Sequence, residues 1–257
     1  MEELTLETTV DQLNVFVYET RDEMGNAAAK KAAKHIQDVL ANKDECNIIF
    51  AAAPSQNELL AGLLDADIEW ERVNAFHMDE YIGLPEGAPQ HFSNFLREAI
   101  FERLPFKNVF YINGSNPSIE DEITRYESLL DKHPVDLCCL GIGENGHIAF
   151  NDPPEARFDD PKPLRIVALD ERSRIQQVND DCFESIDDVP KDALTLTILA
   201  LTRATHMVCV VPGPTKADAV ERCLTGDVGE DCPATILRRH SSASLYLDTD
   251  SASKWTN

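Results

Sequence analysis

The sequence has little positive charge for its length. It contains 23 lysine and arginine residues against 46 aspartate and glutamate residues, which gives a formal net charge of −23 at pH 7. Binding to nucleic acid or to an anionic membrane surface needs clustered basic side chains, so we expect neither partner. A small phosphorylated ligand is compatible with this charge, because backbone amides and one or two cations can hold a phosphate inside an acidic protein.

Long apolar runs and paired cysteines are also missing. No stretch approaches the roughly 18 apolar residues that a membrane span requires, and the first residues lack the basic and apolar regions of a signal peptide. The seven cysteines are an odd number and include no Cys-x-x-Cys pair. This pattern disfavours a zinc site and predicts reduced, mostly structural thiols. We therefore expect a cytoplasmic protein without a metal.

Short apolar runs alternate with longer segments of helical periodicity along the chain. This rhythm predicts a single α/β domain over 1–257, with an open, mainly parallel, Rossmann-like sheet and helices on both faces. The expected strands lie at 13–17, 47–52, 73–78, 108–111, 135–140, 165–169, 206–211 and 244–247. The expected helices lie at 22–40, near 55, and at 93–103, 119–130, 192–201, 215–224 and 234–239.

Ligands of such sheets bind beyond the carboxyl ends of the strands. The candidate site is therefore expected in the loops at 53–57, 79–85, 141–154 and 212–216. The segment 152–163 is rich in proline and acidic residues. We interpret it as a plain surface loop in preference to a lid over the site.

Residues 141–146 read Gly-Ile-Gly-Glu-Asn-Gly and follow the most apolar of the expected strands. They match the GxGxxG pattern of dinucleotide-binding proteins. That site needs a helix to begin within the motif, whereas two prolines at 153 and 154 end any helix soon after it. We therefore interpret the glycines, including Gly143 and Gly146, as allowing a tight turn and a close approach of the backbone to a substrate.

This loop presents His147, with Asn145 two residues before it and Asp152 five residues after it. A histidine beside a carboxylate can be fixed in one tautomer and can serve as an acid or a base near neutral pH. The alternative is a structural histidine that is hydrogen-bonded within a loop. The context favours the catalytic interpretation.

A second candidate is the pair of carboxylates Asp79 and Glu80, which follow the expected strand at 73–78. They lie at the end of the sheet where ligands bind. Asp79 is a candidate general base if its surroundings keep it ionised and leave it without a strong partner. A helix cap or a surface turn is the alternative, since acidic pairs are common in a chain of this composition.

Two further segments are candidate phosphate sites. Ser55 and Gln56 lie where an expected strand leads into a helix, and free amides at a helix N-terminus can hold a phosphate. The segment 212–216, Pro-Gly-Pro-Thr-Lys, repeats this arrangement and adds the cation of Lys216. An ordinary N-capped helix is the alternative in both cases.

Taken together, these segments resemble the glucosamine-6-phosphate deaminase family, whose members are also called glucosamine-6-phosphate isomerases. Residues 76–84 resemble the signature Phe-x-Met-Asp-Glu-Tyr, and residues 141–153 resemble Gly-x-Gly-x-Asp-Gly-His-Ile-Ala-Phe-Asn-Glu-Pro. Residues 189–195 resemble a further block, Val-Pro-x-x-Ala-Leu-Thr. The similarity runs in the same order from about residue 10 to residue 248.

The resemblance implies an open α/β fold and a reaction that converts a 2-amino-aldose 6-phosphate into a ketose 6-phosphate and ammonia. It places Asp79 at the base that moves a proton between C2 and C1, and His147 at the residue that assists ring opening. Asp152 matches a glutamate that supports this histidine, and Lys216 matches a phosphate-binding lysine.

The resemblance also implies a phosphate-binding arginine at Arg172 or Arg174, of which we favour Arg174. No metal and no organic cofactor is implied. The expected partner is a small phosphorylated sugar, and the sequence leaves open whether the protein is a homo-oligomer.

Three positions depart from the family pattern. Asn145 stands where the family has aspartate, and its amide can form hydrogen bonds but carries no charge. Asp152 replaces glutamate and is one methylene shorter. The glycine- and threonine-rich phosphate loop is replaced by Ala-Ala-Pro-Ser-Gln-Asn at 52–57. The first two changes affect the surroundings of His147, and the third affects the expected phosphate contacts.

Two alternative functions stay open at this point. A 6-phosphogluconolactonase has a related sequence, but that family reads Asp-Glu-Arg and Gly-His-Thr-Ala-Ser where this chain has 79–81 and 146–150. A non-catalytic sugar-phosphate-binding or regulatory protein would explain Asn145 and the altered loop at 52–57. The joint presence of Asp79, His147 and Lys216 favours the deaminase over both alternatives.

Overall fold

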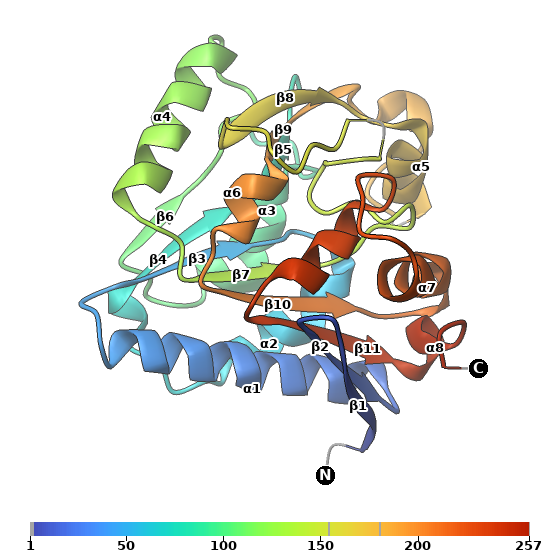
Figure 1. Ribbon diagram of the computed structural model, residues 1–257. Helices are drawn as coiled ribbons and strands as arrows, with labels where there is room; N and C mark the ends of the chain where they lie inside the picture. The colour runs from blue at the N-terminus through green and yellow to red at the C-terminus, as the bar shows by residue number, and fades with distance from the viewer. Residues whose placement is uncertain (1–2, 154, 180, 257) are drawn as a thin grey trace.

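The computed structural model describes residues 3–153, 155–179 and 181–256, and an eight-stranded sheet runs through it (Figure 1). The strand order is β1-β2-β11-β10-β7-β3-β4-β6. β1 and β2 are antiparallel, and the neighbours from β2 to β6 in this order are parallel. The expected open, mainly parallel sheet is thus confirmed. The strands are β1 (Leu4–Val10), β2 (Leu13–Tyr18), β3 (Cys46–Phe50), β4 (Val73–His77), β6 (Asn108–Phe110), β7 (Leu137–Leu140), β10 (His206–Val211) and β11 (Ala243–Asp248).

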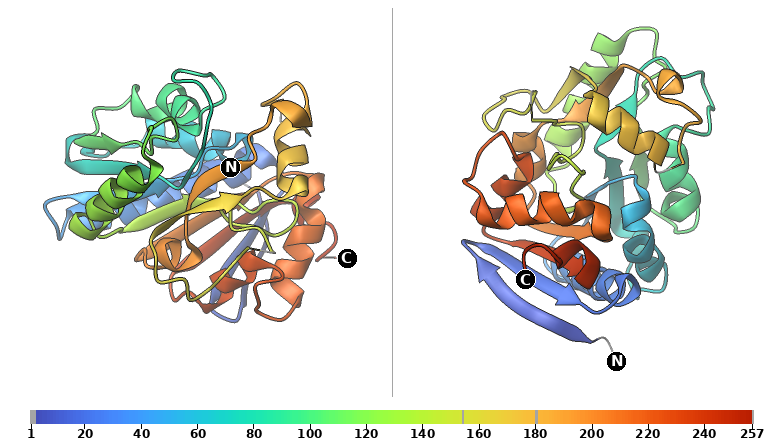
Figure 2. Two further views of the ribbon diagram at one scale, coloured as in Figure 1. Left: turned by 90° about the horizontal axis from the view of Figure 1, so that it is seen from above. Right: turned by 90° about the vertical axis from the view of Figure 1, so that its right-hand side faces the viewer.

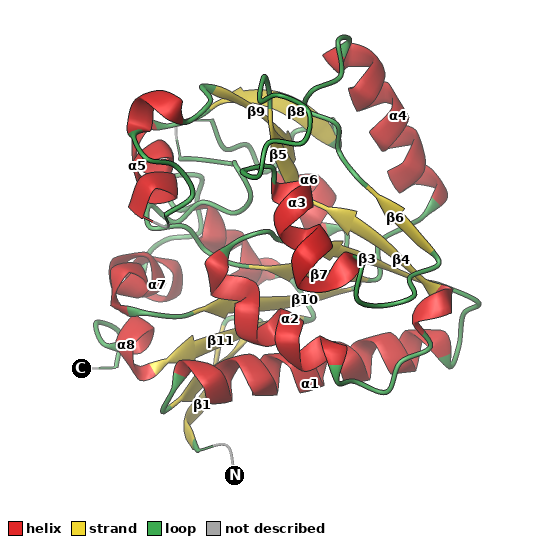
Figure 3. Ribbon diagram, turned by 180° about the vertical axis from the view of Figure 1, so that it is seen from behind, coloured by secondary structure: helices red, strands yellow, loops and turns green. Residues whose placement is uncertain are grey.

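Helices cover both faces of this sheet, as expected (Figures 1 and 3). One face packs against α1 (Arg21–Leu40) and α2 (Asn57–Leu64). The other face packs against α4 (Ile119–Lys132), α6 (Ile198–Thr202) and α7 (Ala217–Thr225), with α8 (Thr249–Ala252) beside α7. Short 3-10 turns lie at Pro54–Gln56, Trp70–Arg72, Ile186–Asp188, Pro214–Lys216 and Pro233–Arg239.

The central strand β7 shows why two helical layers are needed. Successive side chains of a strand point to opposite faces of its sheet. Leu137 and Cys139 join the apolar cluster on the α1 side, and Cys138 and Leu140 join the cluster on the α7 side. All four side chains are at most 1% exposed. A strand that is apolar on both faces must be covered on both, which the sequence run at 135–140 had indicated.

The order of the strands places a topological switch point between β3 and β7. From β3 the chain proceeds outward through β4 to the edge strand β6, and it then returns to β7 and proceeds the other way through β10 and β11. The loops after β3 and β7 therefore separate at the carboxyl end of the sheet. Open α/β sheets bind ligands at such a point.

A second, three-stranded antiparallel sheet lies at this carboxyl end. It consists of β5 (Asp79–Tyr81), β9 (Asp192–Leu196) and β8 (Leu164–Ala168) in the order β5-β9-β8. The predicted single helix at 192–201 is therefore wrong, because the segment is strand β9 followed by helix α6. Apolar residues at 194, 198 and 201 have helical spacing, but long-range pairing with β5 and β8 determines the first half.

Other elements also differ from the prediction. The edge strand β1 and the helix α5 (Glu171–Asn179) were not expected, and Asp79–Tyr81 is a strand although 79–85 was expected to be a loop. Figure 2 shows the β1–β2 hairpin at the outer edge of the molecule. The expected helix at 93–103 is α3 (Phe92–Leu96), which continues as a π-helical turn at Arg97–Phe101.

The proline-rich segment 152–163 contains no helix or strand in the part that the structure describes, which agrees with the expected loop. Pro154, one of the two prolines that follow the glycine motif, lies outside the described residues. Of the described helices, none is long and apolar enough to cross a membrane.

Candidate active site

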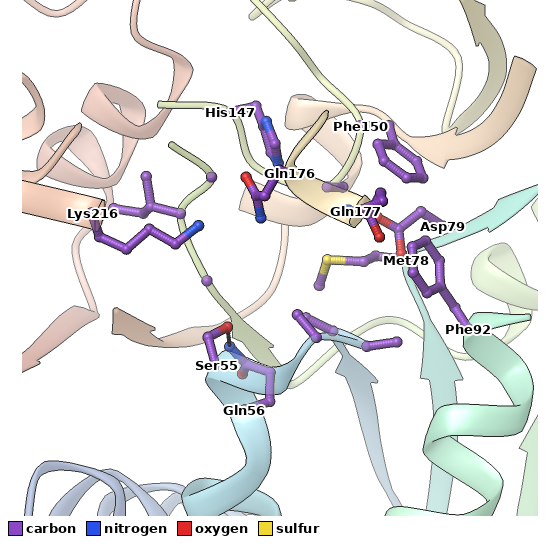
Figure 4. Close-up of a pocket in the computed structure, with 17 residues that line it drawn as sticks. Ser55, Gln56, Met78, Asp79, Phe92, His147, Phe150, Gln176, Gln177 and Lys216 are labelled. Carbon is purple, nitrogen blue, oxygen red and sulfur yellow. Dashed lines mark hydrogen bonds between the residues drawn. The ribbon is translucent and has the colours of Figure 1, made fainter. Parts of the chain in front are cut away.

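A pocket lies at the switch point, where the loops after β3, β4, β7 and β10 meet (Figure 4). The side chains of Ser55, Gln56, Asp79, His147 and Lys216 line it. Each of the four loops that the sequence indicated contributes at least one of them. The prediction that these four segments lie together at the carboxyl end of the sheet is confirmed.

The two ends of the pocket differ in character. Figure 4 shows Lys216, Ser55 and Gln56 toward one side, and Asp79 among aromatic side chains toward the other. Lys216 is only 8% exposed, and Gln56 is 1% exposed. The Oε1 atom of Gln56 is buried and has no hydrogen-bond partner among the described residues. A buried amide oxygen without a partner is costly, so this end is suited to a polar ligand.

His147 is held through its Nδ1 atom. Nδ1 lies 2.8 Å from Oδ1 of Asn145, 3.0 Å from Oδ1 of Asp152 and 3.1 Å from Oγ of Ser173. Two of these neighbours are oxygens that only accept hydrogen bonds, so the tautomer with a proton on Nδ1 fits best. Nε2 then has a lone pair with which to accept a proton from a ligand.

Asn145 and Asp152 form one unit behind this histidine. Nδ2 of Asn145 donates to Oδ1 of Asp152 at 2.8 Å, and the Ser173 hydroxyl donates to the same oxygen. The shorter side chain at 152 therefore reaches His147. Burial raises the pKa of Asp152, but the hydrogen bond from His147, the charge of that ring and the two other donors outweigh burial and lower the pKa to about 2. Asp152 is thus a permanent anion beside the imidazole.

The glycines of this loop serve the protein's own packing. Gly146 has a φ of 89°, and a Cβ atom there would lie 2.6 Å from Sγ of Cys232. Gly143 lines the pocket and accepts a hydrogen bond from the Gly146 amide at 2.9 Å, which closes a tight turn. The expected tight turn is confirmed, and the close approach at Gly146 is made by a cysteine side chain.

Asp79 begins β5 and faces the pocket. It is 7% exposed, and its carboxylate has no hydrogen bond to the described residues. Burial raises the pKa of Asp79 well above its ordinary value of 3.8, and the negative charge of the adjacent Glu80 raises it further. Burial favours the neutral acid, so the raised pKa makes the ionised form of Asp79 less populated and a stronger base where it is present. The expectation of no strong partner is met among the described residues, which leaves the carboxylate oxygens available to a ligand.

Glu80 has the opposite environment although it is the next residue. Its carboxylate accepts hydrogen bonds from the amides of Phe92 and Ser93 at 3.1 and 3.0 Å, and it pairs with Nδ1 of His91 at 3.1 Å. Burial raises the pKa of Glu80, but the hydrogen bond from His91 and the other donors hold it below its ordinary value. Glu80 therefore anchors the start of α3, and Asp79 alone of this pair faces the pocket.

The two candidate arginines lie elsewhere. Arg172 is exposed, and the guanidinium of Arg174 donates to the carbonyl oxygens of Ile186 and Val189. Neither residue lines the pocket. Both of these bonds are made by Nη2 of Arg174, and its Nε is buried without a hydrogen-bond partner among the described residues. The assignment of Arg174 to the phosphate stays a prediction.

Helix α5 supplies pocket residues that sequence reasoning missed. Ser173, Gln176 and Gln177 are buried, while Ile175 on the same helix is 41% exposed. Gln176 and Gln177 line the pocket, and Ser173 binds His147. These residues share one face of the helix through the spacing i, i+3 and i+4, but a polar face is the usual pattern of a solvent-facing surface, so the sequence did not indicate their role. No group of three or more His, Cys, Asp or Glu residues in the described part of the chain could hold a metal ion.

The fold and the pocket define a protein of the open α/β class with its site at the carboxyl ends of the parallel strands. A family model described as "Glucosamine-6-phosphate isomerases/6-phosphogluconolactonase" matches residues 19–246. The chain therefore belongs to this family, which confirms the resemblance inferred from the motifs. Glucosamine-6-phosphate deaminases of Bacillus cereus strain B4264 and Bacillus anthracis strain A0248 are each 36% identical to it over 241 residues, covering 94% of this chain and 88% of theirs.

Solved structures agree with this assignment. The structure of a monomeric glucosamine-6-phosphate deaminase superimposes with a TM-score of 0.84 and 30% identity, covering 93% of this chain and 99% of that one. A 6-phosphogluconolactonase from Thermotoga maritima superimposes with a TM-score of 0.75 and 20% identity, covering 92% and 99% of the two chains. The second match shows the shared fold alone.

Proposed function

We propose that this protein converts a 2-amino-sugar 6-phosphate, with glucosamine 6-phosphate as the first candidate, into fructose 6-phosphate and ammonia. The observation that carries the proposal is Asp79, which is buried, has no side-chain partner in the part of the chain that the structure describes, and lines the same pocket as His147 and Lys216. A non-catalytic binding protein has no need of a carboxylate that is held with a raised pKa. The 36% identity to proteins named glucosamine-6-phosphate deaminase supports the same reaction.

The phosphate is assigned to the end of the pocket formed by Ser55, Gln56 and Lys216. A buried cation offsets the phosphate charge, and the amides that begin the helix after 53–57 add donors. The side-chain amide of Gln56 can donate a hydrogen bond to the phosphate if its Nε2 atom faces the ligand. The hydroxyl of Ser55 can then donate to Oε1 of Gln56. In the structure Nε2 of Gln56 lies 3.1 Å from Oγ of Ser55, so this requires only a rotation of the amide.

Ring opening is assigned to His147. The proton on the C1 hydroxyl must leave and the ring oxygen must gain a proton, so that the C1–O5 bond breaks and an aldehyde forms. Nε2 of His147 is the group that carries this proton, with Nδ1 held by Asn145 and Asp152. The Asp152 anion stabilises the imidazolium that exists between the two transfers.

The proton transfer between carbons is assigned to Asp79. Its carboxylate removes the hydrogen from C2, the released electron pair forms the C1–C2 double bond, and the carbonyl pair moves to O1. Return of the proton to C1 uses the electron pair of the double bond, while the nitrogen lone pair forms an iminium at C2 and O1 takes a proton from solvent. Water then adds to C2, and ammonia leaves to give the ketose.

The direct test is ammonia release, coupled to detection of fructose 6-phosphate, by purified protein given glucosamine 6-phosphate. Galactosamine 6-phosphate and 6-phosphogluconolactone are run in parallel. Turnover of an amino sugar phosphate that disappears in Asp79→Asn supports the proposal. Hydrolysis of the lactone alone would replace it by a lactonase, and phosphate-dependent thermal stabilisation without turnover of any of the three would replace it by a binding protein.

A further inference from the structure

Gln177 reaches the pocket with its amide held in one orientation. Its Oε1 atom accepts a hydrogen bond from the hydroxyl of Tyr81 at 2.8 Å, and the tyrosine is fully buried. The tyrosine ring packs against Phe92, at a centroid distance of 4.7 Å, and against Phe150, at 5.7 Å, and these two rings also contact each other at 5.6 Å. With Oε1 occupied, Nε2 is the part of the Gln177 amide that remains for a ligand, and it has no partner among the described residues.

Strand geometry places this amide on the side of Asp79. Asp79 and Tyr81 are two residues apart on β5, and alternate side chains of a strand point to the same face. The tyrosine that holds Gln177 therefore extends from the same face of β5 as the proposed base. Figure 4 shows Gln177 and Asp79 on the same side of the pocket, across from Lys216.

Three other side chains that Figure 4 labels beside Asp79 cannot donate a hydrogen bond, whereas Gln176 lies toward His147, with its Oε1 accepting from the Glu144 amide at 3.1 Å. Met78, Phe92 and Phe150 have none of the necessary N–H or O–H groups, and the remaining residues at 51–53 are alanines. Removal of the C2 hydrogen places negative charge on O1. An apolar wall leaves such charge unstabilised unless one donor is aimed at it.

We propose that Nε2 of Gln177 donates to O1 of the open-chain sugar and stabilises the charge that forms there while Asp79 holds the C2 proton. Tyr81 is a positioning residue that keeps the amide nitrogen, and not the oxygen, turned toward the substrate. This inference rests on the proposed function, and it adds a donor to the reaction that neither the motifs nor the comparisons assign.

The experiment uses Gln177→Met and Gln177→Glu, with Asn179→Ala as the control on the exposed end of the same helix. Loss of one donor to an oxyanion costs about 10²-fold to 10³-fold in kcat in well-studied cases. We expect Gln177→Met to lower kcat at least about tenfold with KM changed less than about threefold, and Gln177→Glu to lower it further. Asn179→Ala is expected to match the wild type.

Substrate deuterated at C2 separates this role from a structural one. Slower removal of the C2 hydrogen makes that step more rate-limiting, so the isotope effect on kcat is expected to be larger in Gln177→Met than in the wild type. A fall in kcat with an unchanged isotope effect, or a kcat within twofold of the wild type, overturns the proposal. Absence of turnover in the wild type would instead overturn the proposed function.

Tyr81→Phe tests the positioning role. We expect a smaller loss of kcat than in Gln177→Met and no additional loss when the two are combined, because both changes remove the same donor. If the factors by which the two single changes lower kcat multiply in the double variant, Tyr81 and Gln177 act independently and the positioning role is contradicted. A 3-deoxy substrate analogue tests which oxygen is bound: if Gln177→Met has no effect on that analogue, the amide contacts O3 and the assignment to O1 is wrong.

Discussion

The imidazole of His147 occupies the space into which a side chain at Gly143 would project. A Cβ atom at Gly143 would lie 2.1 Å from Cε1 and 2.2 Å from Nε2 of His147. The Gly143 amide also donates to the carbonyl of His147 at 3.0 Å, so the two residues are joined through their backbones. Neither can move away without disturbing the loop, and Gly143 therefore fixes where the histidine lies.

We expect Gly143→Ala to displace this ring and to lower turnover of the cyclic substrate at least about tenfold, because errors of about 1 Å in a catalytic group can cost about 10²-fold. The backbone at Gly143 does not need a positive φ, so the fold should be retained. Activity and the circular dichroism spectrum are measured together. Full activity in a folded variant would show that the ring position is not critical.

His147→Gln tests the assignment of ring opening. The variant keeps a polar side chain but cannot carry a proton, so we expect a large loss on the cyclic sugar phosphate and a smaller loss on a substrate that is already open-chain. The measurement is kcat/KM on both substrates. Equal losses on the two would mean that His147 acts in another step.

Lys216→Ala tests the phosphate end of the pocket. If the phosphate contact is equally strong in the ground state and in the transition state, KM is expected to rise and kcat to change less. Steady-state kinetics of the variant check this, with inorganic phosphate as a competitive ligand. A variant in which kcat falls and KM does not change would contradict the assignment of Lys216 to phosphate binding.

Asp79→Asn is expected to stabilise the folded protein at neutral pH. The pKa of Asp79 is raised in the folded state. The contribution of this carboxyl group to the free energy of unfolding is therefore fully present below its ordinary pKa of 3.8 and is lost as the pH rises through the raised pKa. Asparagine does not ionise. The melting temperature of the variant should therefore exceed that of the wild type by an amount that grows between pH 4 and pH 8, by about 2–4 °C for each kcal/mol. An equal difference at both pH values would contradict the raised pKa.

The parts of the site that were predictable are those encoded in short stretches of sequence. Gly143 and His147 lie in one loop after an apolar strand, and the loop's position at the carboxyl end of the sheet follows from the order of strands and helices. The same holds for Asp79 and Lys216, each of which follows its own strand. The four loops converge because parallel strands all end at one edge.

The remaining parts depend on contacts between distant segments. Gln177 is placed by a hydrogen bond to Tyr81, 96 positions earlier in the chain, and β9 is a strand because it pairs with β5 and β8. Helix α5 has a polar inner face, so apolar periodicity could not reveal it. No local pattern indicated that Ser173 would bind both Asp152 and His147.

The central claim is that Asp79 moves a proton between C2 and C1, and the most direct measurement follows that proton. Glucosamine 6-phosphate deuterated at C2 is given to the wild type and to Asp79→Asn, and loss of deuterium from C2 and its appearance at C1 are measured by NMR. The account predicts loss of the C2 deuterium by the wild type, with part of it transferred to C1 of the product, and no loss by a folded Asp79→Asn variant. Loss of the C2 deuterium at the wild-type rate in that variant would contradict the assigned base.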